Sequence, residues 1–140
     1  METDLKPVRD YLGSVRRMDA DILILEKEYR RLESRQTYIR SPALGDDKVT
    51  GAGRGGFTGL SERLADKAAE ITKLKARRDK IDKRIRKQIG QIHGRYGQIL
   101  LMRYMDRLSL MDIADRIGYS YDQTSRDHII ALQIFRARFF

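Results

Sequence analysis

The chain has 140 residues, a formal net charge of +9, and 35% charged but 8% aromatic residues, which allows one or two small domains with a modest core. The basic excess points to an anionic partner, for which nucleic acid, a membrane surface or an acidic protein would serve. The absence of cysteine excludes disulfides and thiolate metal sites, and the absence of a signal-peptide pattern or of an apolar run near the roughly 20 residues of a membrane span predicts a soluble protein with no membrane partner.

The first predicted element is one long helix from Leu5 to about Ile39. Apolar and amphipathic residues recur there every seven positions in two adjacent rows, which is the pattern of a coiled coil. Acidic and basic residues nearly cancel along this segment, so we expect it to serve packing. One row contains Val8, Val15, Ile22, Tyr29 and Gln36, and the other contains Met18, Leu25, Leu32 and Ile39.

A glycine-rich segment follows at 41–58, and we predict that it forms a flexible loop. Gly51, Gly53 and Gly56 spell GxGxxG, a pattern of dinucleotide-binding sites. No predicted strand precedes it and no βαβ unit surrounds it, so we reject that interpretation and expect no cofactor. The glycines are better explained as positions where the chain reverses its direction.

A second long helix is predicted from about Leu60 to His93. Two long helices of similar reach can fold back on each other as an antiparallel helical hairpin, and we assign 1–93 to this region. A two-helix seam rarely buries enough apolar surface for firm stability, so we expect a homo-oligomer, with a dimer favoured. The two apolar rows of this helix contain Leu64, Ile71, Ile85 and Ile92, and Leu74 and Ile81.

The second helix also carries most of the positive charge. Between Lys73 and Lys87 nine basic residues stand against Asp79 and Asp82. One interpretation is the solvated face of a coiled coil. The other is a surface for DNA phosphates, which would add salt-sensitive affinity without sequence preference. The candidate phosphate contacts are Lys73, Arg77, Lys80, Arg84 and Lys87.

Glycines at positions 90, 94 and 97 predict a boundary, followed by a small C-terminal domain at 94–140. A short helix is expected over 99–105. The tail from Ala131 to Phe140 is rich in apolar residues and is expected to close the core of this domain, although its terminal phenylalanines would also suit docking on a partner such as RNA polymerase.

Within the C-terminal domain, two short helices joined by a tight turn are predicted over 109–132. Ser109 with Asp112, and Ser120 with Gln123, form capping boxes at the two helix starts. Gly118 suits the end of the first helix, where a positive φ is common. Two short helices joined by a glycine-containing turn form a helix-turn-helix, whose second helix enters the major groove of DNA.

The second of these helices has two contrasting faces, since successive residues are separated by about 100°. One face gathers Thr124, Asp127, His128, Ala131 and Phe135, and the other gathers Asp122, Ser125, Arg126, Ile129 and Gln133. Polar groups concentrated in the first turns suit base edges and phosphates, and arginine is the usual partner of guanine.

The run from Arg103 to Leu132 resembles the C-terminal, region 4 helix-turn-helix of bacterial sigma factors, which binds the upstream promoter element. The matching features are Arg103, Tyr104, Ser109, Leu110, Ile113, Ala114, Gly118, Ser120, Ala131 and Leu132. The chain departs from the pattern at Thr124 and Asp127, where an apolar residue is usual. The resemblance implies that Tyr121, Asp122, Ser125 and Arg126 face the DNA, and we extend the candidate DNA-binding set to Ser120, Gln123 and Ile129.

A long helical region before a sigma-like C-terminus also resembles the RinA and ArpU type of late-gene activators from phages of Gram-positive bacteria. This resemblance implies an all-α regulator of transcription that binds double-stranded DNA in the cytoplasm of a bacterial host cell. Host RNA polymerase is a further partner that the resemblance suggests.

Two other functions remain open at this point. A small-terminase-like component of DNA packaging would also combine a helix-turn-helix with helical oligomerisation, and a purely structural coiled-coil adaptor would not bind DNA. An enzyme is not expected, because no Ser-His-Asp set, clustered acids or phosphate-binding loop is present. The two histidines, His93 and His128, are not spaced as a metal-binding pair, so no metal site is expected.

Overall fold

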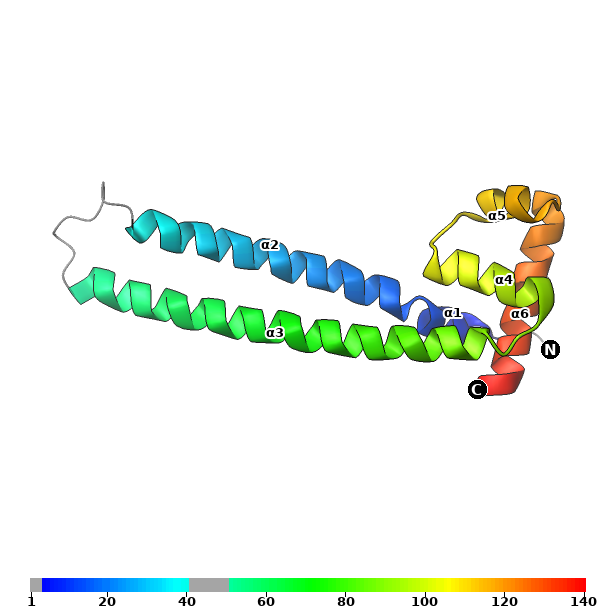
Figure 1. Ribbon diagram of the computed structural model, residues 1–140, viewed down its shortest axis with the longest axis horizontal. Coiled ribbons are helices and arrows are strands. Elements are labelled where there is room, and N and C mark those ends of the chain that lie inside the picture. Colours follow the sequence, from blue (N-terminus) through cyan, green and yellow to red (C-terminus); the bar gives the residue numbers. More distant parts are fainter. Residues whose placement is uncertain (1–3, 41–50) are drawn as a thin grey trace. The chain divides into compact units, whose positions relative to one another are not determined.

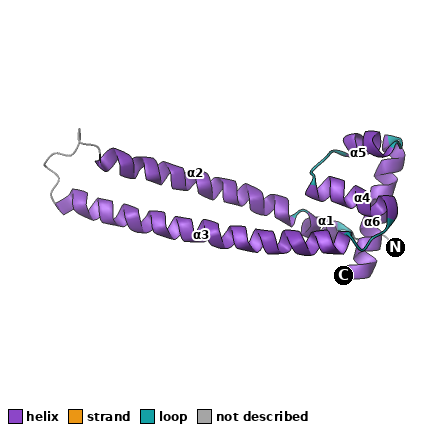
Figure 2. Ribbon diagram, in the orientation of Figure 1, coloured by secondary structure: helices purple, strands orange, loops and turns teal. Residues whose placement is uncertain are grey.

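The computed structural model describes residues 4–40 and 51–140, with side chains described at 4–36 and 59–140. These residues form helices and short connections, with no strand among them (Figure 2). The all-α fold class is therefore confirmed. The chain divides into two compact units, one made of Met1–Met18 with Arg78–Phe140 and the other made of Asp19–Arg77.

The predicted first helix is interrupted at Gly13. Helix α1 covers Lys6–Leu12, and α2 covers Ser14–Arg40. Glycine is a poor helix former, and the Ser14 hydroxyl donates a hydrogen bond to the Tyr11 carbonyl at 2.6 Å, which offers the backbone an alternative to regular helix. The prediction of one continuous helix is therefore wrong at this position.

Helix α3 covers Gly51–Ile89 and begins earlier than predicted. Residues 51–58 of the predicted loop are helical, so Gly51, Gly53 and Gly56 lie within α3 and not at a chain reversal. The rest of that predicted loop, 41–50, lies outside the described residues, as does the side chain of Ile39. The prediction of a loop rested on the glycine content, and it was wrong for residues 51–58.

In the second unit, α2 and α3 lie side by side (Figure 1). Glu28 pairs with Lys67 at 2.8 Å, and the Gln36 side-chain amide donates to the Ser61 hydroxyl at 2.7 Å. Leu32, Leu60 and Leu64 form a small buried cluster beneath these polar pairs. The lysine ammonium holds the pKa of Glu28 below its usual value. Apolar contacts therefore hold the seam from within, and partly buried polar pairs border it.

The first unit has the larger core, in which α6 packs against α1, α4 and α5. Val8 and Leu12 of α1 are completely buried in the same cluster as Leu132 and Phe135 of α6. The Tyr11 hydroxyl also donates to the Gln88 side chain at 2.5 Å. This core joins segments from both sides of residue 93, the predicted end of the hairpin region. The core also contains Leu5, Val15, Ile85, Ile89, Ile92, Leu100, Met105 and Ala131.

The C-terminal helices are α4 (Gly94–Leu100), α5 (Leu110–Ile117) and α6 (Tyr121–Phe139), with a π-helical segment, Leu101–Met105, after α4. Gly97 packs so closely that an added Cβ would lie 2.2 Å from the Ile92 carbonyl oxygen. Phe135 is fully buried while Phe140 is 58% exposed, so most of the apolar tail closes the core as predicted. No helix in the described ranges is long and apolar enough to cross a bilayer.

Candidate nucleic-acid interface

Short-range hydrogen bonds build the starts of α5 and α6 and the turn between them. The Ser109 hydroxyl accepts from the Asp112 backbone N–H at 3.1 Å, and the Ser120 hydroxyl accepts from the Gln123 N–H at the same distance. Gly118 ends α5 with φ of 78°, in the left-handed region where glycine avoids a Cβ clash. Both predicted N-caps and the predicted glycine cap are confirmed.

The two predicted faces of α6 are also confirmed. The inner face is buried and consists of Thr124, Asp127, His128, Ala131 and Phe135. The outer face is exposed or half-buried and consists of Asp122, Ser125, Arg126, Ile129 and Gln133. Ile129 is 41% exposed, which leaves it available for contact with a partner.

The predicted DNA-binding residues gather on the first turns of α6. Ser120 is the exposed N-cap, Tyr121 is 49% exposed, and Asp122 and Arg126 are exposed. Ser125 and Gln123 are half-buried. The structure therefore places five of these side chains on or next to one accessible surface, together with Ile129, and only Gln123 turns inward.

Gln123 was predicted to contact DNA, but its side chain is already hydrogen-bonded within α6. Its side-chain amide N–H donates to Asp127 Oδ1 at 2.9 Å, and its carbonyl oxygen accepts from Arg126 Nη2 at 3.1 Å. The reciprocal half of a capping box would send this side chain back to the Ser120 N–H. Instead, Gln123 links the buried and exposed faces of α6.

Asp127 is a carboxylate whose side chain is 1% exposed, at a position where an apolar residue was expected. Its second oxygen, Oδ2, accepts from Arg95 Nε of α4 at 2.8 Å. This hydrogen bond raises the pKa of Arg95, so the guanidinium stays charged. Both carboxylate oxygens thus have partners, which is the condition for burying this charge.

Arg95 itself is held between aromatic rings. Its guanidinium carbon lies 4.9 Å from the centre of the Tyr96 ring and 5.4 Å from that of Tyr119, within the range of cation–π attraction. Sequence reasoning missed Arg95, because it lies 32 residues before Asp127 and outside the predicted motif. The buried position of an acidic residue in α6 was the only signal that a cation must lie nearby.

A second, partly buried polar pair involves His128 of α6. The Tyr104 hydroxyl and His128 Nε2 are hydrogen-bonded at 2.9 Å, and their rings stack with centres 5.6 Å apart. Burial lowers the pKa of His128 to about 4, helped by the positive charges of Arg9 and Arg103. Burial also raises the pKa of Tyr104. Both side chains are therefore neutral near pH 7 and serve packing.

The candidate phosphate contacts along α3 are all exposed, namely Lys73, Arg77, Lys80, Arg84 and Lys87. Their intervals of three and four residues place them on one side of the helix. Neighbouring cations are used differently, since Lys75 and Arg86 form ion pairs with Glu26 and Asp82. No described carboxylate forms an ion pair with the five candidates, so their charge is available to an anion.

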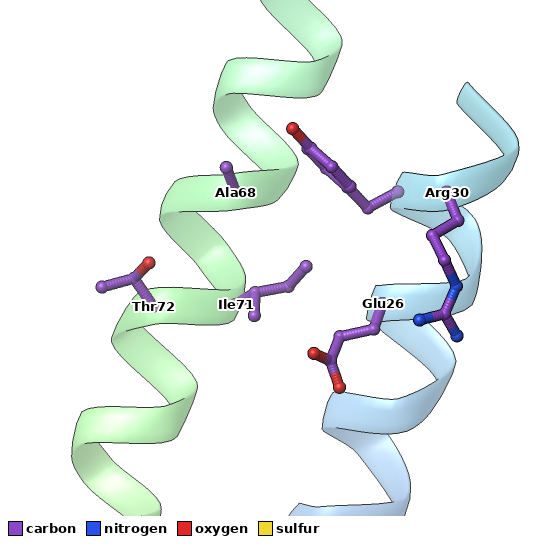
Figure 3. A pocket seen from close by; sticks show the side chains of 6 residues that line it. Glu26, Arg30, Ala68, Ile71 and Thr72 are labelled. Carbon is purple, nitrogen blue, oxygen red and sulfur yellow. The ribbon is translucent and has the colours of Figure 1, made fainter. Parts of the chain in front are cut away.

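A groove of about 260 Å³ lies between α2 and α3 in the second unit. Figure 3 shows Glu26 and Arg30 of α2, and Ala68, Ile71 and Thr72 of α3, around it. None of the predicted site residues lines this groove, and it brings together no set of catalytic groups.

Within 4–40 and 51–140, no three His, Asp or Glu residues are arranged to hold a metal ion. Comparison of the chain with protein-family models, with curated proteins and with solved structures finds no match.

Proposed function

We propose that this chain is a sequence-specific DNA-binding regulator of transcription, in which α5, the turn at Gly118 and α6 act as a helix-turn-helix. The observation that carries the proposal is the outer face of α6. There a helix that is firmly packed on one side presents Asp122, Arg126 and Ile129 to solvent. A packed helix that exposes polar and apolar groups together in its first turns suits a major groove, where both base edges and thymine methyl groups are contacted.

The resemblance to the RinA and ArpU type of activators, which have a sigma-like C-terminal helix-turn-helix, gives the proposal its more specific form, which is activation of phage late genes. The local features that support it are the two serine N-caps, Ser109 and Ser120, and the left-handed Gly118 between them. On this proposal α6 is the recognition helix, and its inner face holds it against α4 and α5. RNA polymerase of the host is the further partner.

The exposed cations of α3 support a second role for DNA, as sequence-independent contacts. Five basic side chains without carboxylate partners attract phosphates, and counterion release makes such binding sensitive to salt. We assign affinity to these residues and sequence preference to α6. The two contributions are separable by experiment, because base contacts and phosphate contacts respond differently to changes of DNA sequence.

We further propose that α2 and α3 act as an antiparallel hairpin that joins copies of the chain, with a dimer favoured. Leu23 and Ile24 of α2 are 49% and 55% exposed, and two adjacent large apolar side chains on a helix surface suit contact with another copy. Replacing both with aspartate should reduce the mass measured by light scattering. Replacing the exposed Arg16 with aspartate is the control and should leave the mass unchanged.

The proposal is tested by gel-shift titration at near-physiological salt. Duplexes from upstream of the operons that neighbour the gene are compared with scrambled duplexes of equal length, for the wild type and for Arg126→Ala. Arg136→Ala, at an exposed position near the far end of the same helix, is the matched control. Preferential binding that is lost only in Arg126→Ala supports a sequence-specific regulator.

Equal binding to both duplexes would contradict that function and favour a packaging component, particularly if light scattering then gave a large ring. No binding to either duplex would favour a structural adaptor. A dimer that prefers one upstream fragment would lead directly to a test with RNA polymerase on that fragment.

A further inference from the structure

Arg126 is the end of a series of hydrogen bonds that begins in α4. Its Nη2 donates to Gln123 Oε1 at 3.1 Å, one helical turn earlier on α6. An arginine on a helix surface usually samples many rotamers, and holding it in one conformation removes entropy that binding would otherwise cost. The conformation of Arg126 therefore depends on how firmly Gln123 is held.

Gln123 has only one amide orientation that satisfies its neighbours. The Asp127 carboxylate only accepts hydrogen bonds, so the amide NH₂ of Gln123 must point to Asp127 Oδ1, at 2.9 Å. The carbonyl oxygen of Gln123 must then point to the Arg126 guanidinium, which only donates. A buried acid on one side thus determines which atom Gln123 presents on the other.

Asp127 is itself fixed from outside α6. Arg95 of α4 donates to its second oxygen at 2.8 Å, and the aromatic rings of Tyr96 and Tyr119 border Arg95. The four side chains Arg95, Asp127, Gln123 and Arg126 alternate donor and acceptor without a break. We call this series the Arg95–Arg126 relay.

We infer that the Arg95–Arg126 relay orients Arg126 to bind guanine, and that Gln123 is a positioning residue and not a base contact. This inference rests on the proposed function. The carbonyl oxygen and one N–H of Gln123 already bond within the relay, so a bidentate contact to adenine would have to share that oxygen with Arg126. Arg126 uses only one of its N–H groups, and the others remain free to donate to guanine O6 and N7.

The test begins with selection of duplexes from a random-sequence library by the wild-type chain at near-physiological salt. Affinities are then measured for the selected duplex and for versions in which each G·C pair is replaced by A·T. The proteins compared are wild type, Arg126→Ala, Gln123→Leu and Gln133→Leu. Gln133 is an exposed glutamine on the same helix, so its substitution is the matched control for Gln123.

We expect one G·C pair whose replacement weakens wild-type binding by about 5- to 150-fold, as a bidentate arginine–guanine contact does. Arg126→Ala should abolish that discrimination, Gln123→Leu should reduce it severalfold, and Gln133→Leu should leave it unchanged. A merely structural effect of Gln123→Leu would weaken binding to both duplexes alike. If Gln123→Leu instead frees the rotamers of Arg126, the ratio of the affinity for the selected duplex to the affinity for the duplex with the replaced G·C pair should fall.

Two results would overturn the inference while leaving the proposed function intact. One is full discrimination at the Arg126-dependent G·C pair in Gln123→Leu. The other is loss of discrimination at an A·T pair in Gln123→Leu, which would make Gln123 a direct contact to adenine. Selection of no common sequence by the wild type would contradict the proposed function itself, and the inference with it.

Discussion

Arg95 of α4 and Asp127 of α6 form an ion pair of 2.8 Å that is strongly asymmetric, because the aspartate side chain is 1% exposed and the arginine side chain is 39% exposed. The cost in stability of removing one partner therefore depends on which residue is left behind. An arginine at the surface can turn to water, whereas the carboxylate has no such alternative.

The first prediction uses this asymmetry. Arg95→Ala should lower the free energy of unfolding by about 3 kcal/mol, since it leaves a buried charge with Gln123 as its remaining partner. Asp127→Ala should cost less, about 1–2 kcal/mol, because Arg95 can be solvated. The double variant should resemble Asp127→Ala. Urea unfolding followed by circular dichroism measures all three, and equal costs for the two single variants would contradict the asymmetry.

The second prediction concerns pH. The pKa of His128 is lowered to about 4 in the folded chain, against about 6.5 when unfolded. Above pH 6.5 both states are neutral at this position and stability is unaffected. Between pH 6.5 and 4 the unfolded state binds the proton first, so the free energy of unfolding decreases as the pH is lowered. The decrease is at most about 3 kcal/mol, at 1.36 kcal/mol for each unit of pKa.

His128→Gln should remove most of this pH dependence, because glutamine can still bond to Tyr104 and does not titrate. His93→Gln is the control, since His93 is exposed and is the one other histidine of the chain. Unfolding free energies at pH 7 and pH 4.5 decide the matter. An unchanged slope in His128→Gln would assign the acid sensitivity to other groups.

The third prediction concerns Thr124, which is fully buried and whose hydroxyl has no hydrogen-bond partner among the described residues. Thr124→Val replaces that hydroxyl with a methyl group of similar size and should stabilise the chain by about 1 kcal/mol. The exposed Thr72 of α3 offers the matched substitution, Thr72→Val, which should change stability by less than about 0.5 kcal/mol. Destabilisation by Thr124→Val would indicate that the hydroxyl has a bound partner in solution.

The fourth prediction compares two glycines in helices. Gly97→Ala should destabilise by about 3 kcal/mol, because its Cβ would lie 2.2 Å from the Ile92 carbonyl oxygen and the backbone would have to move. Gly59→Ala has no atom within 4 Å of the added Cβ, so it should stabilise by up to about 1 kcal/mol through helix propensity. The midpoint temperature of thermal unfolding should therefore fall in Gly97→Ala and rise in Gly59→Ala.

The fifth prediction concerns the exposed cations of α3. Arg84→Ala and Lys87→Ala should weaken binding to preferred and scrambled duplexes by the same factor, and each should reduce the slope of log affinity against log salt by about 1. Lys6→Ala, in α1, is an exposed control that should leave the slope unchanged. A loss confined to the preferred duplex would show that these residues contribute to sequence preference.

Short-range signals predicted α5 and α6 well, but not α4, which begins at Gly94 and ends at Leu100, whereas a short helix was expected over 99–105. Ser109, Ser120 and Gly118 act through hydrogen bonds and backbone angles within a few residues of themselves, so their local sequence was sufficient. The two faces of α6 followed from helical periodicity because burial on one side repeats with the helical turn.

Long-range partners were not predictable in the same way. Asp127 departs from the apolar pattern, and only the fold shows that Arg95 neutralises it. The break at Gly13 depends on a hydroxyl hydrogen bond that competes with the helix, and the early start of α3 at Gly51 contradicts the usual meaning of a glycine-rich segment. The π-helical segment, in which the Asp106 N–H donates to the Leu101 carbonyl, had no sequence signal that we identified.

The shared core of α1 and α6 makes the order of synthesis relevant to folding. Val8, Leu12 and Val15 leave the ribosome early, but Leu132 and Phe135, against which they are clustered, are made last. Each fully buried side chain of this kind contributes about 1.5–3 kcal/mol, so a fragment starting at residue 94 would lose a large share of the roughly 5–15 kcal/mol that stabilises a typical domain. Such a fragment would keep every proposed base contact but hold the helix that carries them less firmly, because part of the core beneath that helix comes from the other end of the chain.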